Sequence, residues 1–479
     1  MTTHQEALRR LVLGTLMPGF IGTTVPDWIT REYAAGLASV CLYGTNVAGP
    51  GQLAQLCAEL RDAAPNLILT VDEEGGDVTR LHYPTGSPQP GNALLGRIDD
   101  TALTRESAAT IGRELTAYGI NLDLAPVVDV NSADENPVIG VRSFGADAAH
   151  VARHTAAWIE GMQSAGVAAC AKHFPGHGDT VTDSHLGLPR VDAPREVVEA
   201  RELEPFRAAI AAGTACVMTS HVLVSSIDPD RPSTFSPVLL EEVLRGQLGF
   251  RGVIVTDALD MAGASAITGI PEAAVRALAA GCDLLCLGSE TSEVLFTEVV
   301  EAILTAVESG RLPRERVEHA AHRVALLSGL FPPPLEGSPS EGAFAQAEAL
   351  AGWFHLEAAA REWIADAAAP AIVQVDTLAN LAVGHVAWGP EAAGLTVPEA
   401  DVPAAAKVAV AARDLSADHP AWRTAERMRA AGHRTIVVEC GWPRGGADLV
   451  TYGGSLVVGQ QLGRLLGLGD HPAGGVDAG

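Results

Sequence analysis

GVAACAKHF, residues 166–174, is an apolar run that ends close to a lysine and a histidine, and this pattern recurs along the chain. The other runs are LVLGTLMPGF, ASVCLYG, NLILTVD, INLDLAPVVDV, ACVMTSHVLV, GVIVTDAL and CDLLCLG. Longer stretches rich in Ala, Leu and Glu separate them, so strands and helices are expected to alternate from residue 11 to about residue 330. Eight such runs favour a (β/α)8 barrel. A doubly wound open sheet is the alternative, because alternation alone does not separate the two architectures.

Polar side chains stand where these apolar runs end. They are Asp72, Asp129, Lys172, His173, His221 and Asp257. In a (β/α)8 barrel the carboxyl ends of all strands meet on one face, and this face carries the catalytic side chains. The placement of these residues therefore favours the barrel and predicts where its active site lies.

The chain of 479 residues is longer than one hydrophobic core usually supports, so two domains are expected. We predict an α/β protein with a TIM-type (β/α)8 barrel over residues 1–331, which carries the active site. Residues 332–369 are predicted to be a linker and a connecting helix, because a segment rich in Pro, Gly and Ser precedes an Ala-rich stretch. Residues 370–479 contain PAIVQVD, KVAVAARD, RTIVVECG and the helical pattern PAWRTAERMRAAG, which predict a small α/β sandwich domain.

Three local elements are predicted from their patterns. ALRRLVLGTLMPGFIG, near the N-terminus, is expected to hold the first strand and not a signal peptide, because Gly and Pro interrupt it. SPVLLEEVLRGQLGF is expected to be a helix capped by Ser236. AFAQAEALAGWFHLEAAAREWIADAAA is expected to form the connecting helix.

The charge of the chain restricts its partners. With 32 Lys and Arg against 58 Asp and Glu, the net charge of −26 argues against nucleic acids and anionic membrane surfaces as partners. No segment offers about 18 uninterrupted apolar residues, so no membrane span is expected. Most of the seven cysteines stand in apolar runs and are expected to be buried reduced thiols, which predicts a cytoplasmic protein.

Titratable residues are densest in KHFPGHGDTVTDSHLGLP, residues 172–189. A loop of this composition is a candidate active site. One alternative is a hydrated surface loop. Another is a metal site built from His173, His177 and His185 with Asp179 and Asp183. The spacing of these residues does not match a helix-borne pair of the HExxH kind.

Asp183 and His185 form the pair that this loop singles out. A separation of two residues allows a carboxylate to contact one imidazole nitrogen. A carboxylate partner stabilises imidazolium and so raises the pKa of such a ring above about 6.5, which suits proton donation near neutral pH. The same pair would also suit a serine nucleophile, so a second group is needed to define the chemistry.

Asp257, in GVIVTDALDMAG, supplies that second group, because it follows an apolar strand. In a retaining glycosidase, an ionised carboxylate attacks the anomeric carbon while an acid protonates the departing oxygen. Asp257 and His185 would fill these roles. Asp260, three residues later, is expected to face elsewhere or to cap the next helix, and capping is the preferred role.

Two further patches carry side chains suited to sugar hydroxyls. TVDEEGGDVTRLH, residues 70–82, offers Asp72, Glu74 and Arg80 beside a Gly pair. Carboxylates accept hydroxyl hydrogens and guanidinium groups donate to hydroxyl oxygens. Glu74 is expected mainly to tie down the turn. NPVIGVRSFG, residues 136–145, offers Arg142, for which a salt bridge is the structural alternative.

Together, DEEGGDVTRL, DLAPVVDV, NPVIGVRSFG, AKHFPGHGDTVTDSHLGLP and VIVTDAL resemble glycoside hydrolase family 3, in particular its bacterial β-N-acetylglucosaminidase branch. The likeness spans roughly residues 5–330. It implies that Asp257 is the nucleophile and that Asp183 and His185 are the acid/base dyad. It also implies the residues that hold the sugar. These are Asp72, Arg80, Arg142, Lys172 and His173.

The resemblance further implies a small glycan substrate, namely terminal β-linked N-acetylglucosamine of peptidoglycan or chitin fragments, and no cofactor. Cleavage would proceed through a covalent glycosyl-enzyme. Asp77 departs from the arginine that many relatives carry after the paired glycines, which leaves the aglycone side open. The C-terminal domain resembles the α/β domain of longer members and is not expected to supply catalytic residues.

Three other functions are weighed against this one. A phosphorylase of the same family would use phosphate in place of water, and a neutral histidine base would not repel that anion. An inactive glycan-binding protein would be expected to lack Asp257 or His185, and both are present. A metal-dependent hydrolase would lose its activity to a chelator.

Overall fold

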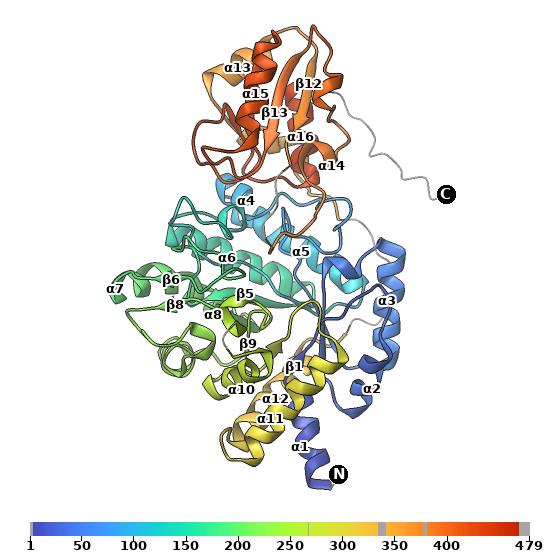
Figure 1. The fold of residues 1–479 in the computed structure, drawn as a ribbon, viewed down its shortest axis with the longest axis vertical. Coiled ribbons are helices and arrows are strands. Elements are labelled where there is room, and N and C mark those ends of the chain that lie inside the picture. The colour runs from blue at the N-terminus through green and yellow to red at the C-terminus, as the bar shows by residue number, and fades with distance from the viewer. Residues whose placement is uncertain (1–2, 267, 334–341, 377–380, 469–479) are drawn as a thin grey trace. The chain divides into compact units, whose positions relative to one another are not determined.

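The computed structural model describes residues 3–266, 268–333, 342–376 and 381–468 (Figure 1). The chain forms two compact units. The first consists of Met1–Glu73, Thr101–Ile139 and Gly145–Gly342, and the second of Glu74–Asp100, Gly140–Phe144 and Ala343–Gly479. The predicted domains follow one another along the chain, whereas these units interleave, because two loops of the first two thirds of the sequence pack with the C-terminal elements. Each unit is described by itself.

The first unit is an α/β structure with a parallel, curled sheet. Its principal strands are β1 (Leu16–Met17), β2 (Ser39–Leu42), β3 (Ile68–Val71), β4 (Leu122–Asp123), β5 (Ala168–Phe174), β7 (Cys216–Thr219), β9 (Val253–Val255) and β10 (Leu285–Cys286). The strand order is β2-β3-β4-β5-β7-β9, and β1 pairs with β10. Each of these strands lies within one of the eight apolar runs. A short parallel pair, β6 (Arg190–Val191) and β8 (Leu223–Val224), lies outside this sheet.

Two contacts connect the edges of the longer sheet to the β1 and β10 pair. Val255, at the end of β9, forms a parallel bridge with Leu284, which precedes β10. On the other side, the backbone N–H of Cys41 in β2 donates to the carbonyl oxygen of Pro18, directly after β1, at 3.0 Å. The parallel order therefore continues around the curled sheet.

Helices accompany the strands of the first unit. They are α1 (Thr3–Leu13), α2 (Asp27–Ala35), η1 (Gly44–Asn46), α3 (Pro50–Ala63), α5 (Thr101–Ala117), α6 (Ala148–Ser164), α7 (Arg195–Val197), η3 (Val198–Glu202), α8 (Leu203–Ala211), η4 (Ser233–Phe235), η5 (Val238–Gln247), α9 (Ala262–Ser265), α10 (Ile270–Ala280), α11 (Glu293–Glu308) and α12 (Arg314–Leu330). The helix predicted after Ser236 is confirmed as η5, which is of the π type. Its Leu239 N–H donates to the Ser236 hydroxyl oxygen at 3.1 Å, as the cap prediction requires.

One apolar cluster gathers side chains from each principal strand. Its members are Met17, Cys41, Ile68, Leu122, Leu124, Ala168, Cys170, Cys216, Met218, Val253, Val255, Leu284, Cys286, Val324 and Leu327. The last two come from α12. The inner face of the curled sheet is therefore a packed core, and the chemistry must lie at its rim. All seven cysteines are free and buried, in agreement with the sequence.

The second unit contains a five-stranded sheet of order β11-β15-β14-β13-β12, in which only β11 is antiparallel to its neighbour. Its strands are β11 (His355–Leu356), β12 (Pro370–Gln374), β13 (Lys407–Ala412), β14 (Thr435–Glu439) and β15 (Leu449–Val450). Its helices are α4 (Asn92–Ile98), η2 (Gly140–Arg142), η6 (Ala347–Trp353), α13 (Ala358–Ala365), α14 (Gly389–Ala392), η7 (Glu399–Asp401), α15 (Pro420–Ala430) and α16 (Leu456–Leu466). The three strands and the helix predicted beyond residue 370 are confirmed as β12, β13, β14 and α15.

The connecting helix predicted over residues 343–369 is wrong. Its sequence instead forms η6, the short strand β11 and α13. His355 and Leu356 pair with Val450 and Leu449, and the Glu357 N–H donates to the Asp448 carbonyl at 2.9 Å. Pairing with the sheet thus overrides the helix propensity of the Ala-rich stretch. The linker predicted before it falls mostly on residues 334–341, outside the described residues.

The first strand is also shorter than predicted. Residues Thr3–Leu13 form the amphipathic helix α1, and only Leu16 and Met17 are in β1. The apolar residues of ALRRLVL suit the buried face of a helix as well as a strand, because short apolar runs do not separate the two.

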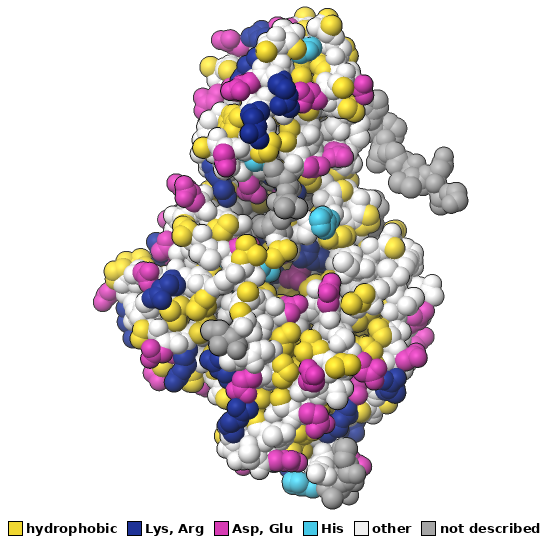
Figure 2. Space-filling model, in the orientation of Figure 1, with side chains coloured by type: hydrophobic (Ala, Val, Ile, Leu, Met, Phe, Trp, Pro, Cys, Tyr) yellow, Lys and Arg dark blue, Asp and Glu magenta, His cyan; other side chains and the backbone are white. Residues whose placement is uncertain are grey.

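No helix in the described part of the chain is long and apolar enough to cross a membrane. On the visible face, Asp and Glu side chains are scattered widely, with Lys and Arg between them (Figure 2). The acidic residues visible on that face are therefore spread over it.

A buried charge cluster precedes β10 in the first unit and generates a test of stability. Asp283 is fully buried and contacts Arg245 at 2.6 Å, Arg316 at 2.5 Å and Arg323 at 3.0 Å, while the Ile254 N–H donates to it at 3.0 Å. Asp283→Asn removes the anion and leaves these guanidinium groups without their counter-charge. We expect the free energy of unfolding to fall by roughly 3–5 kcal/mol in urea titrations.

The matched control is Glu106→Gln, which breaks the exposed pair between Glu106 and Arg113. These side chains are 54% and 58% exposed, so the loss should be about 1 kcal/mol or less. Equal losses in the two variants would contradict the assignment of stability to the Asp283 cluster.

Candidate active site

The predicted polar residues of the first unit gather where its parallel strands end. Asp72 follows β3, Lys172 and His173 are near the end of β5, and Asp257 is two residues beyond β9. The carboxyl ends of parallel strands meet at one edge of the sheet, so side chains far apart in sequence come together there. The Lys172 ammonium, which is 2% exposed, donates to Asp72 Oδ1 at 2.6 Å. This pair places one cation and one anion at the rim.

Asp257 is the carboxylate that follows β9. Its Oδ1 accepts a hydrogen bond from the Ala258 N–H at 2.8 Å. Burial alone would raise the pKa of Asp257, but the charges of His173, His221 and His185 outweigh burial, and the pKa is lowered. Asp257 is therefore ionised near neutral pH, as a carboxylate nucleophile must be.

Asp183 and His185 make the contact that their spacing predicts. His185 Nδ1 lies 2.7 Å from Asp183 Oδ1, and the His185 backbone N–H donates to the same oxygen at 2.9 Å. Burial would raise the pKa of Asp183, but the hydrogen bonds from the ring and backbone of His185 lower it. Asp183 is thus a carboxylate that orients the His185 ring through Nδ1.

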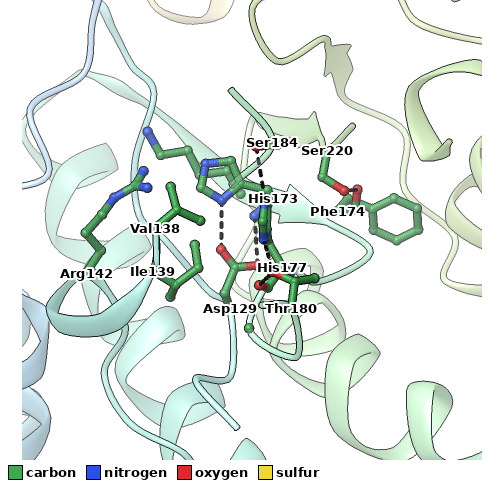
Figure 3. A network of polar contacts seen from close by, with 12 residues as sticks. Asp129, Val138, Ile139, Arg142, His173, Phe174, His177, Thr180, Ser184 and Ser220 are labelled. Atoms are coloured by element: carbon green, nitrogen blue, oxygen red, sulfur yellow. Dashed lines mark hydrogen bonds and ion pairs between the residues drawn. The ribbon is translucent and has the colours of Figure 1, made fainter. Parts of the chain in front are cut away.

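Asp129 joins the two histidines at the end of β5 (Figure 3). Its Oδ2 lies 2.7 Å from His173 Nδ1, and its Oδ1 accepts from the His177 backbone N–H at 2.7 Å. Burial would raise the pKa of Asp129, but the His173 charge and hydrogen bond lower it. The sequence placed Asp129 at a strand end but did not reveal that it holds both residues.

His177 is buried, and both of its ring nitrogens contact hydroxyl groups (Figure 3). Nδ1 lies 2.8 Å from the Thr180 hydroxyl and Nε2 lies 3.0 Å from the Ser184 hydroxyl. Burial lowers the pKa of His177 to about 4, although the Asp129 charge opposes this shift. The ring is therefore neutral near pH 7. Its engaged nitrogens argue against the metal site considered for this loop, because a ligand must present a bare nitrogen.

The loop that carries the dyad contacts the segment that follows Asp257. The Gly263 N–H donates to the Ser184 carbonyl at 3.2 Å. A Cβ at Gly263 would lie 3.0 Å from the Gly187 carbonyl oxygen, 3.0 Å from His221 Cβ and 3.1 Å from the Ser184 carbonyl oxygen. Only glycine fits this close approach without displacing neighbours, so the loop with Asp183 and His185 is packed closely against the segment that follows Asp257.

Asp260 does not cap the helix after it, contrary to the preferred prediction. Helix α9 has Met261 at its N-cap and no side-chain cap. Asp260 instead lies against Gly288, and the backbone N–H of Ser289 donates to it. Burial raises the pKa of Asp260. The alternative prediction, that Asp260 faces elsewhere, is the correct one.

Two predicted sugar-binding arginines belong to the second unit. Arg142 forms a two-pronged ion pair with Glu74, at 2.9 Å from Nε and 2.7 Å from Nη2, and both side chains are buried. The salt bridge considered for Arg142 is thus present, and it fixes Glu74. Arg80 donates to the carbonyl oxygens of Ala382 at 2.6 Å and Val383 at 3.2 Å. Their contact with a sugar stays a prediction.

Asp77, the departure noted in the sequence, is also buried in the second unit. It accepts from the Gly454 N–H at 2.7 Å and lies 3.5 Å from Arg413. Burial raises the pKa of Asp77, and the Arg413 charge opposes this. In this chain the residue therefore ties the 74–100 segment to the C-terminal sheet region.

With this geometry described, comparisons with known proteins define the class. The model of the glycosyl hydrolase family 3 N-terminal domain matches residues 20–327. A β-hexosaminidase of Xylella fastidiosa (strain M23) is 38% identical over 306 residues, which cover 62% of this chain and 88% of that protein. β-Hexosaminidase A of Pseudoalteromonas piscicida is 33% identical over 337 residues, which cover 65% of this chain and 56% of that protein.

Among solved structures, a glycoside hydrolase family 3 β-N-acetylglucosaminidase from Paenibacillus sp. str. FPU-7 superposes with a TM-score of 0.83 at 31% identity. The alignment covers 98% of this chain and 97% of that chain. The chain belongs to glycoside hydrolase family 3, and it is a glycoside hydrolase related to β-hexosaminidases.

Proposed function

We propose that the protein is a retaining exo-β-N-acetylglucosaminidase that removes terminal β-linked N-acetylglucosamine from peptidoglycan or chitin fragments. The observation that carries the proposal is the pairing of an ionised Asp257 with the Asp183–His185 contact on an adjacent loop. The printed names of the Xylella and Paenibacillus proteins support the substrate class. A small glycan is therefore the proposed partner.

In the first step, Asp257 attacks the anomeric carbon from one face of the ring. The glycosidic C–O bond breaks, and its electron pair goes to the leaving oxygen, which takes the Nε2 proton of His185. Asp183 stabilises the charged ring before transfer. The products are a glycosyl-aspartate and the free aglycone.

In the second step, neutral His185 accepts a proton from water through Nε2 while the water oxygen attacks the anomeric carbon. The ester bond to Asp257 breaks, its electron pair returns to the carboxylate, and the β-configuration is retained. The neighbouring histidine charges that lower the pKa of Asp257, against the effect of burial, favour its role as a leaving carboxylate.

The sugar subsite of the first unit is proposed to consist of Asp72, Lys172 and His173. The 2.6 Å contact between Lys172 and Asp72 orients both groups for hydroxyls. The 2.7 Å contact of His173 Nδ1 with Asp129 fixes the orientation of that ring. Charged donors and acceptors strengthen hydrogen bonds to hydroxyl groups.

We further propose that the curled sheet is a closed (β/α)8 barrel and that the second unit contains an α/β sandwich. The bridge between Val255 and Leu284 and the bond from Cys41 to Pro18 support closure. The proposed catalytic domain extends to residue 331, and the sheet of the second unit includes β11 (His355–Leu356) besides the strands predicted beyond residue 370. Seven free, buried thiols support a cytoplasmic location.

The alternative function is phosphorolysis, and one feature of the proposed site is compatible with phosphate as the acceptor. The acid/base is a histidine, which when neutral does not repel an incoming phosphate. We expect release of N-acetylglucosamine from an aryl β-N-acetylglucosaminide to be independent of inorganic phosphate, with the free sugar as product. Turnover that requires phosphate, with glycosyl phosphate as product, would replace hydrolysis by phosphorolysis. The outcome is read by chromatography of the sugar product.

Asp257→Asn should abolish nearly all turnover of the aryl substrate, because the amide is a poor nucleophile and a poor leaving group. We expect a loss of at least about 10³-fold, with unchanged thermal unfolding. A fluorosugar that traps the glycosyl-enzyme should label wild-type protein on the peptide containing Asp257. A label on another carboxylate would overturn the assignment of the nucleophile.

Asp183→Asn tests the dyad through its pH profile. Asp183 is anionic because the His185 hydrogen bonds lower its pKa. Without this anion the imidazolium loses its stabilising partner, so less of the acid is protonated at a given pH. The basic limb of kcat/KM for a substrate with a poor leaving group should move to lower pH. An unmoved basic limb, with activity merely reduced, would show that Asp183 does not tune the ring.

A further inference from the structure

We infer that His177 is a positioning residue for the acid/base loop and acts by holding Ser184 through Nε2 as a neutral ring. This inference rests on the proposed roles of Asp183 and His185. His177 itself is too deeply enclosed by Asp129, Thr180 and Ser184 to meet the substrate.

The hydroxyl contacts define which ring nitrogen of His177 carries the proton. The Thr180 hydroxyl donates its one hydrogen to the His177 carbonyl oxygen at 3.0 Å. It must therefore accept at the 2.8 Å contact with Nδ1, so Nδ1 is protonated. In a neutral ring Nε2 is then an acceptor, and the Ser184 hydroxyl donates to it at 3.0 Å.

Ser184 is fixed at a second point, its backbone. Its carbonyl oxygen accepts from the Gly263 N–H at 3.2 Å, in the segment after the proposed nucleophile. Its side chain is held by His177, and its chain neighbours are the two dyad residues. Ser184 is therefore the point at which the acid/base loop is attached both to the segment that follows β5 and to the segment that follows β9.

The other end of this connection is equally well defined. The His177 N–H donates to Asp129 Oδ1, and the other oxygen of Asp129 contacts His173 Nδ1 (Figure 3). A continuous series of polar contacts thus leads from the proposed sugar-binding His173 to the residue between Asp183 and His185. Loss of the Nε2 contact alone would leave Ser184 held only through its carbonyl oxygen, and would leave His173 in place.

A matched pair of variants separates the contributions of the two ring nitrogens of His177. In His177→Gln the side-chain oxygen can reach the position of Nε2 and accept from Ser184. In His177→Asn the amide can replace Nδ1 and donate to Thr180, but it does not reach Ser184. His177→Gln therefore keeps the contact with Ser184, and His177→Asn keeps the contact with Thr180. Both replacements are amides of similar polarity, and both remove the ring.

We expect His177→Asn to reduce kcat/KM for a poor leaving group by about 10- to 100-fold, part of the roughly 10²–10⁴-fold that a positioned acid contributes. Aryl substrates with activated leaving groups should lose less than about 3-fold, because they depart without a proton. His177→Gln should remain within about 3-fold of wild type on both substrates. Ser184→Ala should match His177→Asn and add nothing to it in the double variant.

The leaving-group dependence separates positioning from packing. A residue needed only for packing would slow both classes of substrate alike, and equal losses in His177→Asn and His177→Gln would overturn the inference. If both variants unfold, the measurement moves to wild type and Ser184→Ala. In 15N-labelled wild type, His177 should show a protonated Nδ1 and a bare Nε2 down to about pH 4. The opposite tautomer of His177 would also overturn the inference. So would equal losses of kcat/KM in Ser184→Ala on substrates with poor and with activated leaving groups.

The proposed function is tested separately by His185→Ala. A selective loss on poor leaving groups in His185→Ala, without one in His177→Asn, would refute only the inference about His177. No selective loss in His185→Ala would refute the proposed acid itself.

Discussion

The arrangement of the proposed catalytic face depends on one buried, ionised carboxylate, that of Asp129. Burial disfavours its charge, and the neighbouring His173 charge restores it. Its Oδ2 lies 2.7 Å from His173 Nδ1, and its Oδ1 accepts from the His177 N–H at 2.7 Å and from the His173 N–H at 3.3 Å. A buried anion without such partners would be costly, so the two histidines and the carboxylate stabilise one arrangement together. The orientation of the proposed sugar-binding ring and the starting point of the acid/base loop are consequently fixed by the same group.

Polar contacts anchor the part of the loop that carries Asp183 and His185. Val181 and Leu186, which flank the dyad, are exposed, whereas Asp183 and Ser184 are buried. Apolar packing therefore cannot fix the dyad, and the geometry rests on polar contacts made by His177, Gly263 and the dyad itself. Directional hydrogen bonds specify position with few contacts, which suits a loop that must present His185 to solvent and substrate.

The sequence predicts most of the first unit because its signals are local. The strands lie in apolar runs of the sequence. The ends of those runs predict that Asp72, His173 and Asp257 lie near the carboxyl ends of strands, as they do. The two-residue spacing of Asp183 and His185 likewise predicts their contact. The parts that sequence reasoning missed depend on distant partners. Pairing of Leu356 with Leu449 breaks the predicted connecting helix, and Asp77 meets Gly454 across the second unit. The role inferred for His177 could not be predicted, because residue type and spacing do not reveal which nitrogen carries a proton.

The histidines at this face differ in their contacts and protonation because their surroundings differ. His177 contacts hydroxyl groups at both nitrogens, and burial keeps its pKa at about 4. His221 is buried as well, and its pKa is lowered although the Asp257 charge opposes this shift. His185, in contrast, has a carboxylate at Nδ1 and a partly exposed ring. An imidazole that is to exchange a proton needs an ionic partner and access to the substrate, whereas an anchor must keep a fixed set of donors and acceptors. Since His177 takes up a proton only near pH 4, its contact with Ser184 persists over the pH range in which His185 is proposed to change its charge.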